Sequence, residues 1–280
     1  MASGPGAQLD PSLPVAMFDS GVGGLTVLHE CLVSLPQEDY VYLGDTACFP
    51  YGSREPEWLR RRIGRIAELL LGRGAKLLVI ACNTATAVGE EVAREVAAAA
   101  GVEVVPVVEP QAEIAAAITA NGRVGVLATP NTVASGAYRR ALEAQGRGLD
   151  VIEVQAPRLA PFIQDGTLFD EETMAMARSY CAPLREAEVD TLILGCTHYP
   201  LVAPMLQRIL GRDVRLVAGG HAVAAAVQRT LEGAGLARGG REEGRYDFLC
   251  TGDPDAFHAV GTRFLQMPLG EVERVEVEGL

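Results

Sequence analysis

The segment LLVIACNTA, residues 77–85, and the segment TLILGCTHYP, residues 191–200, decide the fold of this chain. In each segment a short run of branched, uncharged residues leads into a cysteine, Cys82 or Cys196. Such a run is typical of a buried strand in a parallel sheet. The residues after each cysteine favour a helix, since residues 86–100 are rich in alanine, valine and glutamate and a proline suits the first turn of the second helix. Both thiols are therefore expected at the carboxyl end of a strand, where open α/β folds bind ligands.

The two halves of the chain repeat one order of expected elements, which indicates an internal duplication of a βαβαβ unit. In each half, a first and a second strand are each followed by a helix, and the third strand ends in the cysteine. The tail is expected to return to the first half of the molecule. It would add a strand at residues 246–250 and a helix that begins at Pro254. The expected strands of the two units are residues 15–18, 40–43 and 77–81, then 123–128, 151–154 and 191–195. The expected helices include residues 56–72, a helix from Ser135 and residues 171–186.

Composition limits the class of protein. A chain of 280 residues, 49% of them apolar, can bury one large core or two of ordinary size, which fits a globular α/β protein. The formal net charge of −12 argues against nucleic acid as a main partner, because phosphate binding needs a basic surface. No secretory signal and no membrane-spanning run is recognised, and the six cysteines form no spacing framework. We therefore expect reduced thiols, no membrane partner and a cytoplasmic location.

The sequence also bears on cofactors and metals. Lys76 is the single lysine, against 23 arginines. A pyridoxal phosphate enzyme needs a lysine for its Schiff base, and Lys76 would lie about 20 Å from the Cys82 thiol at roughly 3.3 Å per residue of strand. Cys196 and His198 could be two ligands of a zinc site, but C-x-H is not a usual zinc spacing and no second ligand pair stands close by. We therefore expect neither a cofactor nor a metal.

Several motifs have a simpler interpretation when each is taken alone. The glycines of residues 21–24 suggest dinucleotide binding, but Thr26 stands where G-x-G-x-x-G needs its last glycine, so this interpretation fails. Asp19 could be a functional carboxylate at a strand end or a helix cap. Cys82 alone could be a buried structural thiol. The remaining cysteines are expected to be packing residues: Cys31, Cys48, Cys181 and Cys250.

The motifs taken together favour one kind of chemistry. The two halves would face each other with Asp19 and Cys82 on one side and Cys196 and His198 on the other. Each thiol then has a titratable neighbour that can hold or take its proton. Two thiols would face each other across a cleft that has no suitable lysine and no set of metal ligands. This arrangement fits removal of a proton from one face of a carbon and its replacement from the other face. That is inversion of a stereocentre.

This combination of motifs resembles the glutamate racemases of the aspartate/glutamate racemase family, which make D-glutamate for bacterial cell walls without a cofactor. The resemblance extends over nearly the whole chain. The matching stretches are FDSGVGG at 18–24, GDTA at 44–47, FPYG at 49–52, ACNTA at 81–85, SGAY at 135–138, GCTHYP at 195–200 and TGD at 251–253.

The resemblance implies a fold and a set of site residues. It implies two pseudo-symmetric, doubly wound α/β domains with the active site in the cleft between them. We expect residues 1–106 with 217–280 to form the first domain and residues 107–216 the second. Cys82 and Cys196 are carried over as the acid/base pair, with Asp19 and His198 assisting; Cys196 would take the α-proton of L-glutamate and Cys82 that of D-glutamate. The implied substrate contacts are Asp19, Ser20, Tyr51, Gly52, Asn83, Thr84, Thr129, Thr132, Thr197 and His198.

The motifs contain no arginine or lysine that could hold a dianionic substrate. Its carboxylates would therefore be held by backbone N–H groups at helix starts and by neutral side chains, including the amide of Asn83. One thiol would need a lowered pKa while the other stays protonated. L- and D-glutamate are the expected small-molecule partners, and a homodimer is one assembly to consider.

The chain departs from the family pattern at three places. Cys48 replaces the arginine of Asp-Thr-Ala-Arg, Ala156 and Gln164 stand where the family usually has a cysteine and a glutamate, and residues 218–220 replace a later Asp-Ser-Gly. These departures bear on rate, regulation and substrate preference rather than on the cysteine motifs. Two alternatives stay open. One is a racemase for aspartate or another acidic amino acid, and the other is a non-catalytic binder that kept the pocket.

Overall fold

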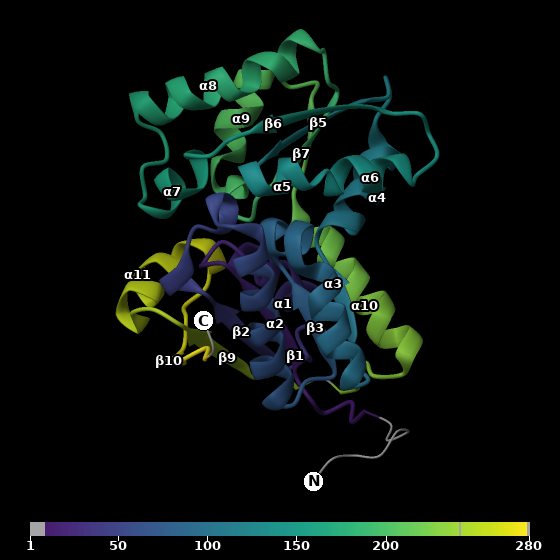
Figure 1. Ribbon diagram of the computed structural model, residues 1–280, viewed down its shortest axis with the longest axis vertical. Helices are drawn as coiled ribbons and strands as arrows, with labels where there is room; N and C mark the ends of the chain where they lie inside the picture. The colour runs from purple at the N-terminus through teal and green to yellow at the C-terminus, as the bar shows by residue number, and fades with distance from the viewer. Residues whose placement is uncertain (1–8, 241, 279–280) are drawn as a thin grey trace.

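The computed structural model describes residues 9–240 and 242–278, which form two parallel β-sheets with helices around them (Figure 1). The first sheet has the strand order β10-β9-β2-β1-β3-β4, and the second has the order β6-β5-β7-β8. The strands of the first sheet are β1 (Val15–Asp19), β2 (Tyr40–Gly44), β3 (Leu77–Ile80), β4 (Glu103–Pro106), β9 (Tyr246–Cys250) and β10 (Val272–Arg274). Those of the second are β5 (Arg123–Ala128), β6 (Asp150–Gln155), β7 (Thr191–Gly195) and β8 (Arg215–Val217).

Helices connect the strands throughout. The α-helices are α1 (Leu25–Ser34), α2 (Pro56–Gly72), α3 (Asn83–Ala99), α4 (Val108–Ile118), α5 (Pro130–Ser135), α6 (Ala137–Glu143), α7 (Leu159–Gln164), α8 (Glu171–Glu186), α9 (Ala203–Leu210), α10 (Gly219–Ala234) and α11 (Pro254–Leu265). Short 3₁₀ helices are η1 (Thr46–Cys48), η2 (Tyr51–Ser53) and η3 (Tyr199–Val202). Among the described residues, no helix combines the length and the apolar character needed to cross a membrane.

Strand order confirms the predicted duplication, because β2-β1-β3-β4 in one sheet corresponds to β6-β5-β7-β8 in the other. Helices α2 and α3 cover one face of the first sheet, where they pack on Phe18 and Ile80. Helices α1, α10 and α11 cover the other face, on Met17 and Val79, since neighbouring residues of a strand point to opposite faces. In the second unit α8 lies on the side away from the first sheet, and α5 and α6 lie toward it (Figure 1). The expected doubly wound α/β fold is confirmed.

The tail returns to the first sheet, where β9 pairs with β2 and β10 pairs with β9. Strand β8 ends at Val217 in the second sheet, and α10 begins at Gly219 and packs beside α1. The chain thus passes between the two units close to the expected boundary at 216/217. The domain boundaries themselves stay a prediction.

The register of the strands aligns their carboxyl ends at one edge of each sheet. In the first sheet, Asp19 at the end of β1 pairs with Gly44 of β2. Ile80, the last residue of β3, pairs with Phe18, the residue before Asp19. In the second sheet, Ala128 of β5 pairs with Gly195 of β7. Every segment that carries a predicted site residue therefore leaves its sheet at one of these two edges.

Two helices differ from the sequence-based expectation. The single helix expected from Ser135 is wrong: α5 begins at Pro130, and α6 follows it after Gly136. Gly136 has φ +67°, a left-handed conformation that glycine adopts readily and that interrupts a helix. The helix after β3 begins at Asn83 rather than near Thr86, because the sulfur of Cys82 itself caps it.

The single lysine has a structural partner. Lys76 is buried just before β3, and its ammonium group forms an ion pair with Glu38 and donates to the backbone oxygen of Pro11 at 2.6 Å. The second carboxylate oxygen of Glu38 accepts the backbone N–H of Arg238 at 2.6 Å. This fully buried pair joins four separate segments of the chain at the amino-terminal edge of the first sheet.

Replacing Lys76 with methionine should lower the free energy of unfolding by about 3–5 kcal/mol, because the Glu38 carboxylate would stay buried without its partner. The double variant Lys76→Met/Glu38→Gln removes both charges and should recover much of that loss. Denaturant unfolding of the three proteins measures both effects. A Lys76→Met protein as stable as the parent chain would contradict this account of the ion pair.

Candidate active site

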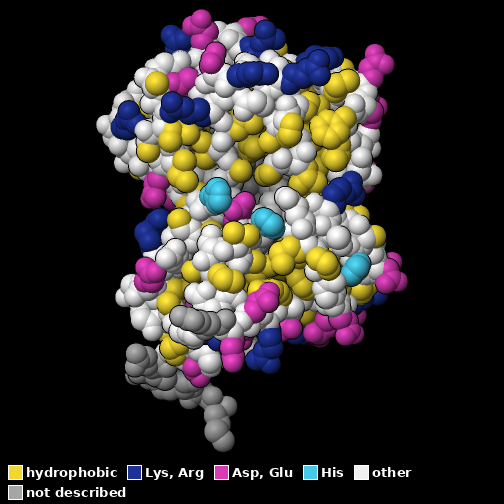
Figure 2. Space-filling model, turned by 180° about the vertical axis from the view of Figure 1, so that it is seen from behind, with side chains coloured by type: hydrophobic (Ala, Val, Ile, Leu, Met, Phe, Trp, Pro, Cys, Tyr) yellow, Lys and Arg dark blue, Asp and Glu magenta, His cyan; other side chains and the backbone are white. Residues whose placement is uncertain are grey.

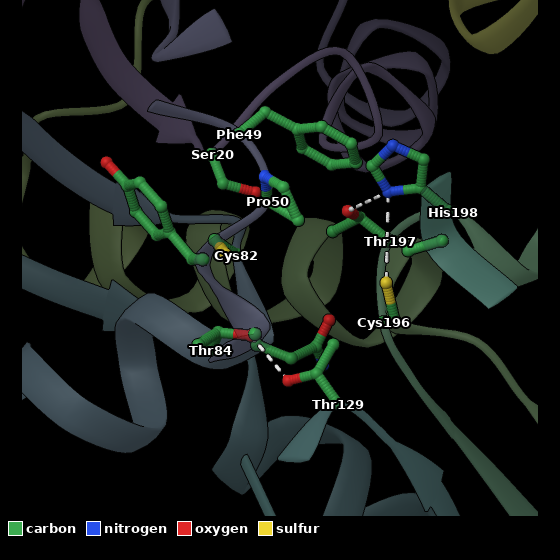
Figure 3. Close-up of a pocket in the computed structure, with 13 residues that line it drawn as sticks. Ser20, Phe49, Pro50, Cys82, Thr84, Thr129, Cys196, Thr197 and His198 are labelled. Atoms are coloured by element: carbon green, nitrogen blue, oxygen red, sulfur yellow. Dashed lines mark hydrogen bonds between the residues drawn. The ribbon is translucent and has the colours of Figure 1, made fainter. Parts of the chain in front are cut away.

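A pocket lies where the carboxyl ends of the two sheets face each other (Figure 3). It is small: the room left for the centre of a water-sized sphere is about 20 Å³. No lysine, arginine, aspartate or glutamate lines it, so its wall is formed by thiols, hydroxyls, an amide, rings and backbone. The lining residues are Ser20, Phe49, Pro50, Tyr51, Gly52, Cys82, Asn83, Thr84, Thr129, Ala160, Cys196, Thr197 and His198.

Cys82 occupies the N-cap of α3, directly after β3. Its Sγ accepts the backbone N–H of Ala85 at 3.4 Å, and the side chain is buried. Burial raises the pKa of the Cys82 thiol far above its usual range, and the negative charge of Asp19 raises it further. The N–H groups of Ala85 and Ser20 and the Ser20 hydroxyl act in the opposite direction but do not compensate.

Cys196 lies across the pocket from Cys82, after β7 (Figure 3). Its Sγ is 3.8 Å from Nδ1 of His198. Burial raises the pKa of the Cys196 thiol to about 12, although the backbone N–H of His198 and the Thr197 hydroxyl favour the thiolate. The expected lowered pKa of one thiol is therefore not found in this closed pocket, because desolvation exceeds the local hydrogen bonds at both cysteines.

His198 is buried beside Cys196 and is uncharged at neutral pH. Burial lowers the pKa of its imidazole to about 4, against the opposing effect of the Asp19 charge. The ring packs between Phe49, at 5.2 Å, and Phe264, at 5.1 Å between ring centroids. The amide oxygen of Gln164 lies 3.0 Å from Nε2, so Nε2 carries the proton and the lone pair of Nδ1 faces the thiol. Nδ1 of His198 can therefore accept a hydrogen bond from the Cys196 thiol.

Asp19 lies beneath the pocket and does not line it. One carboxylate oxygen accepts the backbone N–H groups of Gly21 and Gly24, at 3.2 and 3.0 Å, and the other accepts the Thr197 hydroxyl at 3.4 Å. Asp19 thus organises the turn before α1 and contacts the segment that carries Cys196, and its functional role stays a prediction. Its charge acts on both thiols and on His198.

Three threonines join the two units beside the pocket. The hydroxyl of Thr84 lies 2.8 Å from that of Thr129 and 3.3 Å from that of Thr132, and the last two are 2.9 Å apart. Thr132 is fully buried behind the pocket wall. Gly52 approaches this cluster so closely that a Cβ there would lie 2.7 Å from the Cβ of Thr129, which explains the glycine.

Two predicted substrate contacts already have protein partners. The hydroxyl of Tyr51 donates to Asp45 at 2.5 Å, and that carboxylate also binds Arg62 in a buried ion pair. The side-chain amide N–H groups of Asn83 donate to protein acceptors as well. The predicted contact of the Asn83 amide with a substrate carboxylate stays a prediction.

The structure adds residues that were not among the predicted substrate contacts. Phe49, Pro50 and Ala160 line the pocket. Gln164 determines which ring nitrogen of His198 carries the proton. Phe49 and Pro50 could have been found, since they stand in a motif with two predicted contacts. Within residues 9–240 and 242–278, no group of three or more histidine, cysteine, aspartate or glutamate side chains is placed to hold a metal ion.

Comparison with known proteins places this site in a family. The profile described as Asp/Glu/Hydantoin racemase matches residues 26–227. A glutamate racemase of Geobacter metallireducens is 42% identical over 96% of this chain and 98% of its own length. The crystal structure of glutamate racemase isoform RacE1 from Bacillus anthracis matches with TM-score 0.88 at 31% identity, over 95% of this chain and 98% of that one. Glutamate racemase from Francisella tularensis in complex with D-glutamate matches with TM-score 0.89 at 28% identity, over 96% and 99%.

The buried, neutral state of His198 predicts a pH-dependent stability. The pKa of His198 is about 4 in the folded state, below the unfolded value of 6.5. Its contribution to the free energy of unfolding is therefore fully present above pH 6.5 and is lost as the pH falls toward 4. The full contribution is up to about 3 kcal/mol at 1.36 kcal/mol per pKa unit. His198→Asn should therefore lose less stability than the parent chain between pH 7 and pH 4.5, measured by denaturant unfolding. The exposed His221, replaced by asparagine, is the control, and equal losses in the parent and His198→Asn proteins would refute the prediction.

Proposed function

We propose a reaction for this chain from one established premise: it belongs to the Asp/Glu/Hydantoin racemase family and is an amino-acid racemase, an isomerase. The reaction is the cofactor-independent interconversion of L-glutamate and D-glutamate by two cysteines, supplying D-glutamate for peptidoglycan. The observation that carries this proposal is the placement of Cys82 and Cys196 on opposite sides of one pocket. Each follows the corresponding strand of its unit, β3 or β7.

Glutamate is favoured over aspartate by the relatives that cover the whole chain, such as the Geobacter metallireducens enzyme. An aspartate racemase of Picrophilus torridus shares 16% identity and a TM-score of 0.53, so it supports the fold alone. The hydroxyls of Ser20, Thr84 and Thr129, with the N–H groups at the start of α3, are the neutral donors that would hold the two carboxylates.

The proton steps follow from the uncharged thiols. Cys196 loses its thiol proton to solvent before the pocket closes, and the thiolate then removes the α-proton of L-glutamate. The Cys82 thiol donates its proton to the opposite face of the carbanion, which gives D-glutamate and a Cys82 thiolate. The neutral His198 lies beside Cys196, with Nδ1 at 3.8 Å from the sulfur. In the reverse direction the Cys82 thiolate removes the α-proton of D-glutamate and the Cys196 thiol donates.

The carbanion needs a dry and closed site. Hydrogen bonds to the α-carboxylate stabilise its developing charge more strongly when water is excluded. We therefore expect the two units to separate for substrate entry and to close again before the chemistry.

The proposal assigns no role to pyridoxal phosphate. A Schiff base needs an available lysine, and Lys76 is committed to its ion pair with Glu38 at the far edge of the first sheet. The cysteines supply both protons themselves, so the reaction balances without an oxidant, a reductant or a group donor.

Replacing either Cys82 or Cys196 with alanine should lower racemisation in both directions by roughly 10³-fold or more, because each direction needs one thiolate and one thiol. A coupled assay started from L-glutamate and from D-glutamate measures both directions. Cys48→Ala is the matched control and should stay within a few-fold of the parent rate, since Cys48 does not line the pocket.

Three results would count against the proposal. Racemisation that survives at more than a trace in either alanine variant contradicts the paired-thiol mechanism. Faster turnover of D-aspartate than of D-glutamate contradicts the substrate. Binding of glutamate by the parent chain without any turnover contradicts catalysis and favours a binding protein.

A further inference from the structure

Gln111 in α4 connects the two units from a fully buried position. Its side-chain nitrogen donates to the backbone oxygen of Leu194 at 3.3 Å and to that of Val217 at 3.2 Å. Leu194 lies in β7, two residues before Cys196, and Val217 ends β8. Backbone oxygens only accept hydrogen bonds, so the orientation of the Gln111 amide is fixed: its nitrogen faces the second sheet and its oxygen faces away from it.

The oxygen of Gln111 faces the start of α3. It accepts from Nδ2 of Asn83 at 2.9 Å and from the hydroxyl of Tyr138 at 2.5 Å. Tyr138 has one hydroxyl hydrogen, which it gives to Gln111, so its oxygen accepts the second hydrogen of Asn83 Nδ2 at 2.6 Å. Gln111 and Tyr138 thus hold the amide nitrogen of Asn83 on their side.

The amide nitrogen of Asn83 therefore faces the protein, while its oxygen is left as an acceptor. It lines the pocket next to Cys82, and the hydrogen bonds of the described residues give its Oδ1 no protein partner. No carboxylate lines the pocket, since Asp19 lies beneath it and is bonded to Gly21, Gly24 and Thr197. An amide oxygen in a wall without anionic groups suits an ammonium group.

We propose that Gln111 is a positioning residue: it orients the amide of Asn83 so that only the carbonyl oxygen of Asn83 is presented to the substrate, where it accepts from the α-ammonium group. This inference rests on the proposed function, because it assigns a contact to the amino-acid substrate. It makes Asn83 a residue that distinguishes an amino acid from a plain dicarboxylate, and Gln111 the residue that sets this preference from outside the pocket.

The test compares two ligands that differ in the ammonium group. Calorimetry measures the Kd of racemic glutamate, whose composition the enzyme leaves unchanged, and the Kd of glutarate, which has both carboxylates and no ammonium. Gln111→Met keeps the side-chain length but frees the Asn83 amide to rotate. It should weaken glutamate binding about 10-fold, as expected for a hydrogen bond to a charged group, and leave glutarate binding within 2-fold.

Two further variants sharpen the comparison. Tyr138→Phe removes one of the two acceptors of Asn83 and should weaken glutamate alone, by about 3-fold; it decides the question if Gln111→Met does not fold. Gln207→Met is the control, because the Gln207 amide also donates to two backbone oxygens, those of Gly211 and Val214, but lies away from the pocket. It should change neither Kd.

Each contrary outcome has a distinct meaning. If Gln111→Met weakens both ligands alike, or weakens neither, Gln111 has no positioning role and this inference is overturned. A larger loss for glutarate than for glutamate would mean that Asn83 donates to a carboxylate, which also overturns it. A parent protein that fails to bind racemic glutamate overturns the proposed function and this inference together.

Discussion

Parallel pairing of the strands is the constraint on which the rest of the molecule depends. It aligns the carboxyl ends of β1, β2 and β3 at one edge of the first sheet, and those of β5 and β7 at one edge of the second. Because the two edges face each other, segments far apart in the chain meet in one pocket without any loop having to reach across the molecule (Figure 1). Duplication of the unit then places one cysteine on each side.

The same enclosure determines the electrostatics of the site. Charged groups near the pocket are satisfied by protein partners, Asp19 by N–H groups and a hydroxyl and Asp45 by Arg62, so the wall itself stays neutral. Burial keeps the Cys82 and Cys196 thiols protonated. With a net charge of −12, the chain as a whole does not attract an acidic substrate from a distance. Figure 2 shows this surface, with acidic and basic side chains spread over both units. Recognition must therefore come from short-range hydrogen bonds in the closed pocket.

Sequence patterns predicted the parts of this structure that depend on neighbours in the chain. The apolar runs before Cys82 and Cys196 are strands, and the helices at Pro56–Gly72 and Glu171–Glu186 have the expected ends, because periodicity and caps are local signals. The polar groups behind the pocket could not be predicted in this way. Gln111 and Tyr138 resemble ordinary helix residues in the sequence, and their role appears only when α4 and α6 bring them to Asn83, 28 and 55 residues away. The direction of the thiol pKa shifts failed for a similar reason, since desolvation depends on the whole enclosure and not on the helix start alone.

The central claim is that two thiols act on opposite faces of one carbon, and the fate of the α-proton in heavy water tests it most directly. With Cys82 and Cys196 fixed on opposite sides, the proton that enters comes from the thiol that did not remove the first one, and that thiol equilibrates with solvent. Mass spectrometry after brief turnover of L-glutamate should find deuterium at Cα in nearly all of the D-glutamate formed, while the remaining L-glutamate stays largely protiated. D-Glutamate that keeps a substantial share of the original proton, or L-glutamate that exchanges faster than it racemises, would contradict the two-thiol account.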